Sequence, residues 1–423
     1  MPIKARPEVL NQLTIEDKAA LMSVYWHRCL DEAQLRQFFY SNLEAKTNDY
    51  TLGRIQWMVQ NELLEIDVFG EDEHCVFYLT NRGLQTVRAF YETPLYVIDS
   101  KTGRKVYDVT SRQLQPANKL LNHQLHLNTL SLDIQQRCGL PDTCYKDSKF
   151  ASNFTYAQPD GVFELPAMDI FLEMDMAHER LSDLLRKWDH YRNYLSSREY
   201  YLRRNKRIIV LFATENIKRG IAYRRSKVLS SISRSIFDIL GEQFDCYIGP
   251  STEMAQIAES IIKGEQDQAF NTIGSFLQSQ CGFSFSRPRK VKELCGESYL
   301  YMRRTVTFPN EYQQTFFLEN YLNRSVSVLH KIAAYEHTCS ILFANGRLPI
   351  PLLVIVPSED AIYQDLKAID HLYTTNVLFT TAKRLKEKPF LEALFQFDQM
   401  GNRYHFADNN YAPTSKIHEK KGG

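Results

Sequence analysis

Several features that would assign a function at once are scarce or absent in this chain of 423 residues. Its eight cysteines include no CxxC pair and no zinc-finger spacing, so we expect no zinc site and reduced thiols. No apolar run approaches the length of about 18 residues that a membrane span needs, and the N-terminus lacks the apolar core of a secretory signal. We therefore expect a cytoplasmic protein without membrane insertion.

The net charge is small, at +1, but the charges are unevenly distributed. Between Arg180 and Lys227 stand fourteen Lys or Arg against four Asp or Glu. A basic face of this kind binds polyanions, although a solvated helix surface has the same composition. This run supplies three candidates for DNA contact, which are Arg203, Arg204 and Lys206. An apolar fraction of 44% over this length predicts more than one packed domain.

Acidic residues gather around one predicted strand. The turn 159–161 (PDG) precedes an apolar run, 170–172 (IFL), which ends in Glu173, Met174 and Asp175. Residues i and i+2 of a strand share a face, so Glu173 and Asp175 point together toward Asp160. Carboxylates at one edge repel one another unless a cation is bound, and oxygen ligands suit Mg²⁺ or Mn²⁺. An ordinary strand with solvated acids at its end fits the same pattern.

Two histidines interrupt the strongly helical segment that precedes these acids. His123 and His126 lie three residues apart in the predicted helix 117–136 and therefore share one face. A neutral imidazole can carry a proton, orient a water or contact a phosphate. A histidine satisfied by a backbone carbonyl is the alternative for either residue.

The N-terminal region predicts three helices, at 17–27, 31–40 and 47–61, followed by a hairpin of strands 64–69 and 75–79. This order is that of a winged helix, and the ending YLTNRGLQTV resembles the segment that closes the wing in that family of DNA-binding domains. The third helix would then enter the major groove. Its candidates for base or phosphate contact are Thr47, Asn48, Arg54 and Gln56. A protein-binding winged helix is the alternative.

The order of motifs resembles that of the replication-relaxation proteins, which include MobC-type relaxases of plasmids and conjugative elements. The positions that match are His123, His126, Asp160, Gly161, Glu173, Asp175, Lys187 and Tyr191. The resemblance implies a PD-(D/E)XK restriction-endonuclease fold, a mixed sheet flanked by helices that holds one or two metal ions. Asp175 departs from that pattern, because it stands where the fold usually has a lysine. Lys187, one helix later, is the candidate to replace this lysine.

The chemistry implied by the resemblance is metal-assisted cleavage of a phosphodiester. Asp160, Glu173 and Asp175 would hold Mg²⁺ or Mn²⁺, while the histidines or Lys187 would assist proton transfer or position the phosphate. The nucleophile is either a metal-activated water or a tyrosine, since Tyr191 and Tyr194 follow on the same predicted helix.

The C-terminal part repeats the plan of the acidic region. Phe317-Leu318-Glu319, Lys331 and Tyr335 correspond to Phe171-Leu172-Glu173, Lys187 and Tyr191. Asp175 corresponds to Tyr321, so we expect a degenerate copy. The sequence thus predicts an α/β protein with a winged helix (1–92), a linker (93–116), a PD-(D/E)XK-like catalytic domain (117–265), a degenerate second nuclease-like copy (283–408) and a flexible tail (409–423).

These patterns predict a relaxase, a metal-dependent DNA endonuclease that makes a site- and strand-specific nick at a transfer origin to start mobilisation. The expected partners are double- and single-stranded DNA of that origin and a coupling protein or other relaxosome components. Two alternatives stay open. One is a non-catalytic DNA-binding accessory or replication regulator, and the other is a defence or repair nuclease with the same site.

Overall fold

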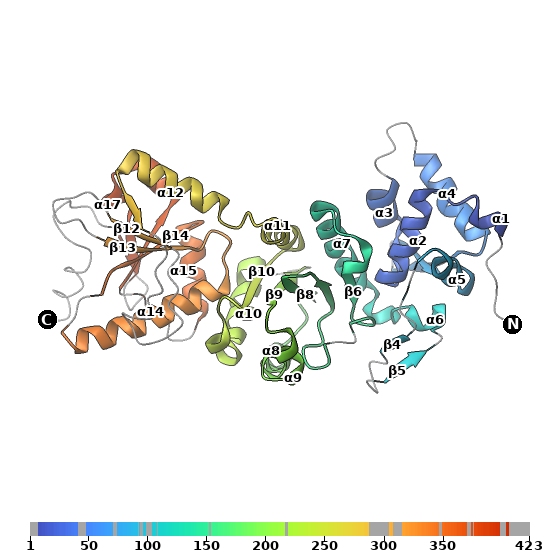
Figure 1. Ribbon diagram of the computed structural model, residues 1–423, viewed down its shortest axis with the longest axis horizontal. Coiled ribbons are helices and arrows are strands. Elements are labelled where there is room, and N and C mark those ends of the chain that lie inside the picture. The colour runs from blue at the N-terminus through green and yellow to red at the C-terminus, as the bar shows by residue number, and fades with distance from the viewer. Residues whose placement is uncertain are drawn as a thin grey trace. The chain divides into compact units, whose positions relative to one another are not determined.

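The computed structural model describes residues 7–40, 48–70, 74–91, 93, 96–98, 104–107, 109–151, 154–215, 219–286, 304–307, 315–346, 349–369, 374, 376–397 and 403–405. It is a mixed α/β structure, as the sequence predicts (Figure 1). Its contacts divide it into two compact units. The first comprises Met1–His178, Asn193–Asn216 and Pro250–Glu259, and the second comprises Glu179–Arg192, Ile217–Gly249 and Ser260–Gly423.

The N-terminal part of the first unit consists of helices and a small sheet. Its elements are α1 (Pro7–Leu10), α2 (Ile15–His27), β1 (Leu30–Asp31), α3 (Glu32–Leu35), η1 (Arg36–Tyr40), α4 (Asn48–Gln60), β2 (Leu64–Phe69), β3 (His74–Leu79) and α5 (Asn81–Phe90). The three strands lie in the order β1-β3-β2. Thr14 and Asp31 begin α2 and α3 with capping boxes, because each side chain accepts from a backbone N–H in the first turn. The predicted helices 17–27 and 47–61 and the hairpin are observed, whereas the predicted helix 31–40 is divided into α3 and η1.

A short connection leads from this part to the long helix α7. It contains β4 (Tyr96–Ile98), β5 (Lys105–Tyr107), α6 (Ser111–Leu114), η2 (Asn118–Leu120) and α7 (Leu121–Cys138). Gln34 Nε2 donates to the carbonyl of Leu125 at 2.7 Å, and Asn128 Nδ2 donates to the carbonyl of Cys29 at 2.6 Å. Arg28 Nε donates to the carbonyl of Leu114 at 2.7 Å. The first two bonds fix α7 against the N-terminal part, and the third fixes α6 there.

The sheet of the first unit carries the acidic residues. Its elements are η3 (Asp142–Cys144), β6 (Tyr145–Asp147), β7 (Gly161–Glu164), β8 (Met168–Asp175), α9 (Arg198–Arg203) and β9 (Arg207–Thr214). Within this unit the strands lie in the order β9-β8-β7-β6. β7 runs antiparallel to β8, and β9 runs parallel to β8. Two helices, α8 (Leu181–Leu195) and α11 (Ser251–Ile262), contribute residues to both units.

The second unit contains the C-terminal sheet. Its elements are α10 (Ile221–Ser235), η4 (Phe237–Ile239), β10 (Phe244–Gly249), α12 (Gln268–Cys281), β11 (Ser284–Ser286), β12 (Arg304–Thr307), β13 (Thr315–Asn320), α14 (Val326–Ala344), β14 (Leu352–Val356), α15 (Glu359–Ala368), β15 (Val377–Thr381), α16 (Ala382–Glu387), α17 (Phe390–Ala393), β16 (Phe395–Phe397) and β17 (Arg403–His405). The strands run in sequence order from β11 to β17. α12 and α14 cover opposite faces of β13 and β14 (Figure 1).

Both sheets share one sequence of pairings. β12 is antiparallel to β13 and β13 is parallel to β14, as β7, β8 and β9 are paired in the first unit. In the second unit Lys331 of α14 contacts Glu319 of β13, with Nζ 2.5 Å from Oε2. A lysine on the helix therefore reaches the strand carboxylate in this copy.

Tyr321, the predicted counterpart of Asp175, belongs to a buried ionic network. Its hydroxyl donates to Oδ2 of Asp365 at 2.7 Å, and Nε of Arg225 lies 2.9 Å from Oδ1 of the same carboxylate. Arg324 adds a second guanidinium at 2.7 Å. The network joins α10 to α15, because a buried carboxylate requires such partners.

No helix in the described part of the chain has both the length and the apolar character that crossing a membrane requires. The predicted contact residue Thr47 and the tail 409–423 lie outside the described residues.

Candidate functional site

His123 and Asp160 meet at the edge of the first sheet. Nε2 of His123, on α7, lies 3.0 Å from the carbonyl oxygen of Met174 and 3.3 Å from Oδ2 of Asp160. Both partners accept hydrogen bonds, so the ring nitrogen between them carries the hydrogen. Nδ1 is then the basic nitrogen of the neutral ring. The imidazole is therefore oriented to accept a proton at Nδ1. The two oxygens beside Nε2 would stabilise the positive charge that results.

Asp160 is positioned by β8 from the other side. It directly precedes β7, whose first residue, Gly161, pairs with Leu172 of β8. Its backbone N–H donates to the carbonyl of Leu172 at 3.1 Å, and its Oδ2 accepts from the N–H of Met174 at 2.9 Å. These two bonds hold Asp160 against the backbone of β8, while its approach to the side chain of Glu173 stays a prediction.

The acids of this edge differ in their access to solvent. The side chain of Asp160 is 27% exposed and that of His123 is 28% exposed, whereas Glu173 and Asp175 are buried. Tyr194 packs on Phe171, on the face that Glu173 and Asp175 share, with ring centroids 5.7 Å apart. A ligand from solvent therefore meets His123 and Asp160 first.

The acidic side chains do not converge on one point. Oδ1 of Asp175 accepts from the backbone N–H of Ala177 at 3.0 Å, and Asp160 is engaged by Met174 and His123. Among the residues that the structure describes, no group of three or more His, Cys, Asp or Glu could hold a metal ion. The residues as placed do not fit a three-ligand site for Mg²⁺ or Mn²⁺. The assignment of Asp160, Glu173 and Asp175 as metal ligands stays a prediction.

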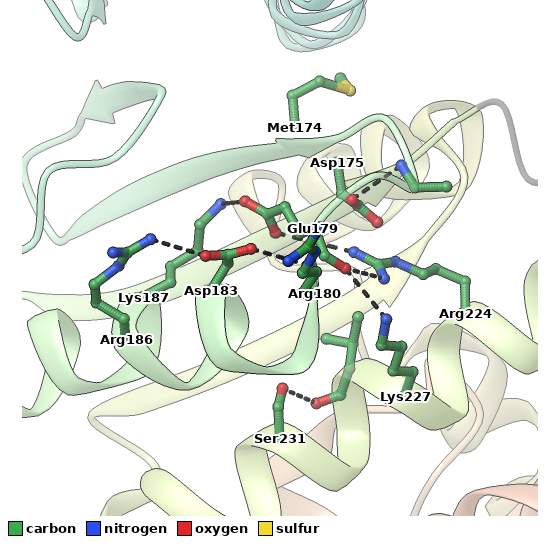
Figure 2. Close-up of polar contacts among 12 residues, drawn as sticks. Met174, Asp175, Glu179, Arg180, Asp183, Arg186, Lys187, Arg224, Lys227 and Ser231 are labelled. Carbon is green, nitrogen blue, oxygen red and sulfur yellow. Dashed lines mark hydrogen bonds and ion pairs between the residues drawn. The ribbon is translucent and has the colours of Figure 1, made fainter.

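Lys187 and Tyr191 belong to the second compact unit, whereas the His123 group belongs to the first. Nζ of Lys187 lies 3.0 Å from Oε1 of Glu179 (Figure 2). Tyr191 is fully buried, and its ring packs against Trp188 and Phe244. Its hydroxyl is not presented to solvent.

The second tyrosine considered as a nucleophile is also buried. Tyr194 has no exposed surface, and burial raises the pKa of its phenol well above the ordinary value. A nucleophilic tyrosine must reach the phosphorus and lose its proton. In this conformation Tyr194 meets neither condition.

His126 lies half-buried on α7, one turn after His123. The contact with Asp160 is made by His123. The structure thus brings together one of the two predicted histidines and the turn aspartate.

The basic candidates after α8 lie at the other end of the strands. Met168 pairs with Arg207 and Asp175 pairs with Thr214, so Arg203 and Lys206 precede β9 at the end remote from Asp175, about 23 Å along the strand. Both side chains lie 2.9 Å from the buried carboxylate of Asp169. Arg204 is exposed, and its guanidinium lies 4.3 Å from the ring centroid of the exposed Tyr201. Of these three basic residues, Arg204 is the most exposed, whereas Arg203 and Lys206 are half-buried.

The residues of α4 that were predicted to contact DNA also differ from one another in their surroundings. Arg54 Nε lies 3.3 Å from Oδ1 of the buried Asp17, and its guanidinium stacks 4.5 Å from the ring centroid of Trp57. Gln56 is exposed. Asn48 begins α4.

Two residues with defined roles were not singled out in the sequence. Asp169 anchors Arg203 and Lys206, and Glu179 contacts Lys187. For Asp169 a signal existed, because a carboxylate inside an apolar strand requires a cationic partner. Glu179 lies in the polar segment between β8 and α8, so its position in the sequence does not indicate a cationic partner.

One family model matches the chain. Residues 21–211 match the model described as replication-relaxation, and this segment contains every candidate site residue. Neither a curated protein nor a solved structure matches the chain. The description of this family suggests a role in replication or mobilisation. The part of the chain that carries His123, Asp160 and the acidic strand is thus similar to the replication-relaxation family.

Proposed function

We propose that the protein is a relaxase-like DNA endonuclease that nicks one strand at an origin, with His123 and Asp160 at its catalytic centre. The observation that carries the proposal is the pairing of a partly exposed imidazole with a carboxylate and a carbonyl oxygen. Two acceptors hold the hydrogen on Nε2, so they support Nδ1 as a general base.

The proposed step is hydrolysis of a phosphodiester. A water attacks phosphorus, its proton passes to Nδ1 of His123, the bond from phosphorus to the leaving oxygen breaks, and that oxygen takes up a proton. The products are a phosphomonoester and a hydroxyl end. Water is preferred over tyrosine because Tyr191 and Tyr194 are both buried. A bound Mg²⁺ or Mn²⁺ would add stabilisation of phosphoryl charge.

The N-terminal part is proposed as a winged helix that reads the origin. The sheet order β1-β3-β2 and the helices α2 to α4 support this assignment. α4 would be the groove-reading helix, with the exposed Gln56 as its base contact, while Arg54 holds α4 on Asp17. The mixed pairing of β7, β8 and β9 supports a PD-(D/E)XK-like, MobC-type core, and relaxosome proteins would be its partners.

Nicking of a supercoiled plasmid that carries the presumed transfer origin tests the proposal. The wild type should convert it to the open circle, and His123→Gln should lose this activity by about 100-fold or more. Asp133→Asn, on the same helix and paired with Arg137, is the matched control. Parallel reactions with Mg²⁺, Mn²⁺ or a chelator test the cofactor separately. A plasmid that stays supercoiled under all three conditions would exclude the enzyme.

A second candidate is a DNA-binding accessory or replication regulator without catalysis. The burial of Glu173 and Asp175, together with the result that no three-ligand group occurs among the described residues, favours it. Specific binding to the origin by wild type and His123→Gln alike, without nicking, is the outcome expected for this alternative.

A further inference from the structure

Three cationic side chains converge on Glu179 in the second compact unit (Figure 2). Nζ of Lys187, on α8, lies 3.0 Å from Oε1, and a guanidinium nitrogen of Arg224, on α10, lies 4.0 Å from Oε2. Arg224 and Lys227 also donate to the backbone carbonyl of Glu179, at 2.9 and 3.2 Å. Because Arg224 and Lys227 are three residues apart on a helix, they share the face that meets Lys187 at Glu179.

The cluster is largely shielded from water. The side chains of Arg224 and Lys187 are 4% and 18% exposed. Charges in such surroundings interact more strongly than charges at the surface, and cations there require anionic or acceptor partners. The cluster therefore has the electrostatic character of an anion site.

Glu179 fills this site incompletely. Its Oε1 contacts Lys187, but its Oε2 is buried and has no hydrogen-bond partner among the described residues. The gap of 4.0 Å to Arg224 is too long for a hydrogen bond. A planar carboxylate with two oxygens thus satisfies one cation and leaves its second oxygen unbonded.

We propose that Lys187, Arg224 and Lys227 form a binding site for a phosphate group of the nucleic-acid backbone, which Glu179 occupies when no nucleic acid is bound. The inference rests on the proposed function, since it names the group through which the second unit would hold the DNA. A tetrahedral phosphate directs oxygens toward several donors at once, and guanidinium and ammonium groups are its usual partners. On binding, the phosphate displaces the carboxylate of Glu179.

Binding of a short single-stranded oligonucleotide, followed by fluorescence anisotropy over a range of salt concentrations, tests the site. Glu179→Gln keeps the shape of the side chain but removes the competing charge, so it should bind several-fold more tightly than the wild type. Lys187→Gln and Lys227→Gln should bind more weakly, each with a salt slope lower by about 0.7. All three substitutions affect the binding of the same phosphate. The tighter binding of Glu179→Gln and the weaker binding of the two lysine variants should therefore be observed together.

Arg186→Gln is the matched control. Arg186 precedes Lys187 on α8, is 70% exposed and pairs with Asp183 (Figure 2), so its variant loses one charge outside the cluster. It should keep the affinity and salt slope of the wild type. If Glu179→Gln binds no more tightly, and the two lysine variants behave like Arg186→Gln, the proposed site is wrong.

Inorganic phosphate separates this inference from the proposed function. If the wild type binds no oligonucleotide, the DNA-processing proposal fails, and the site is judged by thermal unfolding with phosphate against chloride at equal ionic strength. Phosphate should raise the unfolding temperature of Glu179→Gln more than that of Glu179→Gln/Lys187→Gln. Equal shifts in these two variants would overturn the inference, because phosphate would then act elsewhere.

Discussion

Nε2 of His123 on α7 lies 3.3 Å from Oδ2 of Asp160, in the turn before β7. The two residues should therefore act as one unit in the proposed reaction. Asp160→Asn removes the charge that stabilises the imidazolium, and His123→Gln removes the base itself. Each change should lower the single-turnover nicking rate by about 100-fold or more.

The double variant tests the coupling. Because both changes remove the same function, the double variant should be little slower than either single variant. If the factor by which the nicking rate falls in the double variant equals the product of the factors in the two single variants, the two residues act independently. Circular dichroism of all three variants checks that the fold is retained.

Gly161 is required by a close contact in the first sheet. A Cβ atom at this position would lie 2.8 Å from the hydroxyl oxygen and 2.9 Å from Cε2 of the buried Tyr145. Gly161→Ala should therefore lower the free energy of unfolding by about 1–3 kcal/mol, measured by urea denaturation. It should also impair nicking, since Asp160 is the adjacent residue.

Gly53 provides the control for this substitution. It lies within α4, and a Cβ atom there would meet nothing within 4 Å. Gly53→Ala should raise the free energy of unfolding by about 0.5–1 kcal/mol, because alanine is the better helix former. A destabilisation by both substitutions would contradict the described packing.

Arg203 and Arg204 should have different roles despite being neighbours. Arg203 is bonded to the buried carboxylate of Asp169, so Arg203→Gln should lower the free energy of unfolding by about 2 kcal/mol. Arg204 is exposed beside Tyr201, so Arg204→Gln should leave stability unchanged and weaken the binding of DNA. Urea denaturation and anisotropy on the same two samples check this contrast. Equal effects on stability would refute it.

The stability of the protein should depend on His27 below neutral pH. The ring is fully buried, stacked 4.6 Å from Tyr145, and burial lowers its pKa from 6.5 to about 4. Between these values the unfolded chain binds more protons, so the contribution of His27 is complete above pH 6.5 and declines toward pH 4. Between pH 7 and pH 5 the wild type should lose about 2 kcal/mol relative to His27→Phe.

The wild type has to be compared with His27→Phe because the titration of Asp142 changes the free energy of unfolding in the opposite direction. Burial raises the pKa of Asp142 to about 6, so its contribution to stability decreases as pH rises from 4 to 6. The difference between wild type and His27→Phe cancels this effect. His337→Gln, at an exposed position, should follow the wild type at every pH. A constant difference between wild type and His27→Phe would refute the assignment.

Local patterns in the sequence were sufficient to predict most secondary structure. The strand 64–69 is observed with the predicted ends, and the helix predicted at 47–61 is observed as α4 (Asn48–Gln60). Such features depend on hydrophobic periodicity and on capping residues within one turn, both of which are local. The sharing of one face by Glu173 and Asp175 also follows from strand geometry alone.

The sequence by itself thus determined the α/β class, most helices and strands, and the similarity of residues 21–211 to the replication-relaxation family. Only the tertiary structure decided which candidate side chains meet. It paired His123 with Asp160, assigned Arg203 to Asp169, and buried Tyr191. These outcomes depend on strand register and on helix packing between residues far apart in the chain. No local pattern encodes them, since a charged side chain in a sequence fits a buried ion pair and a DNA contact equally well.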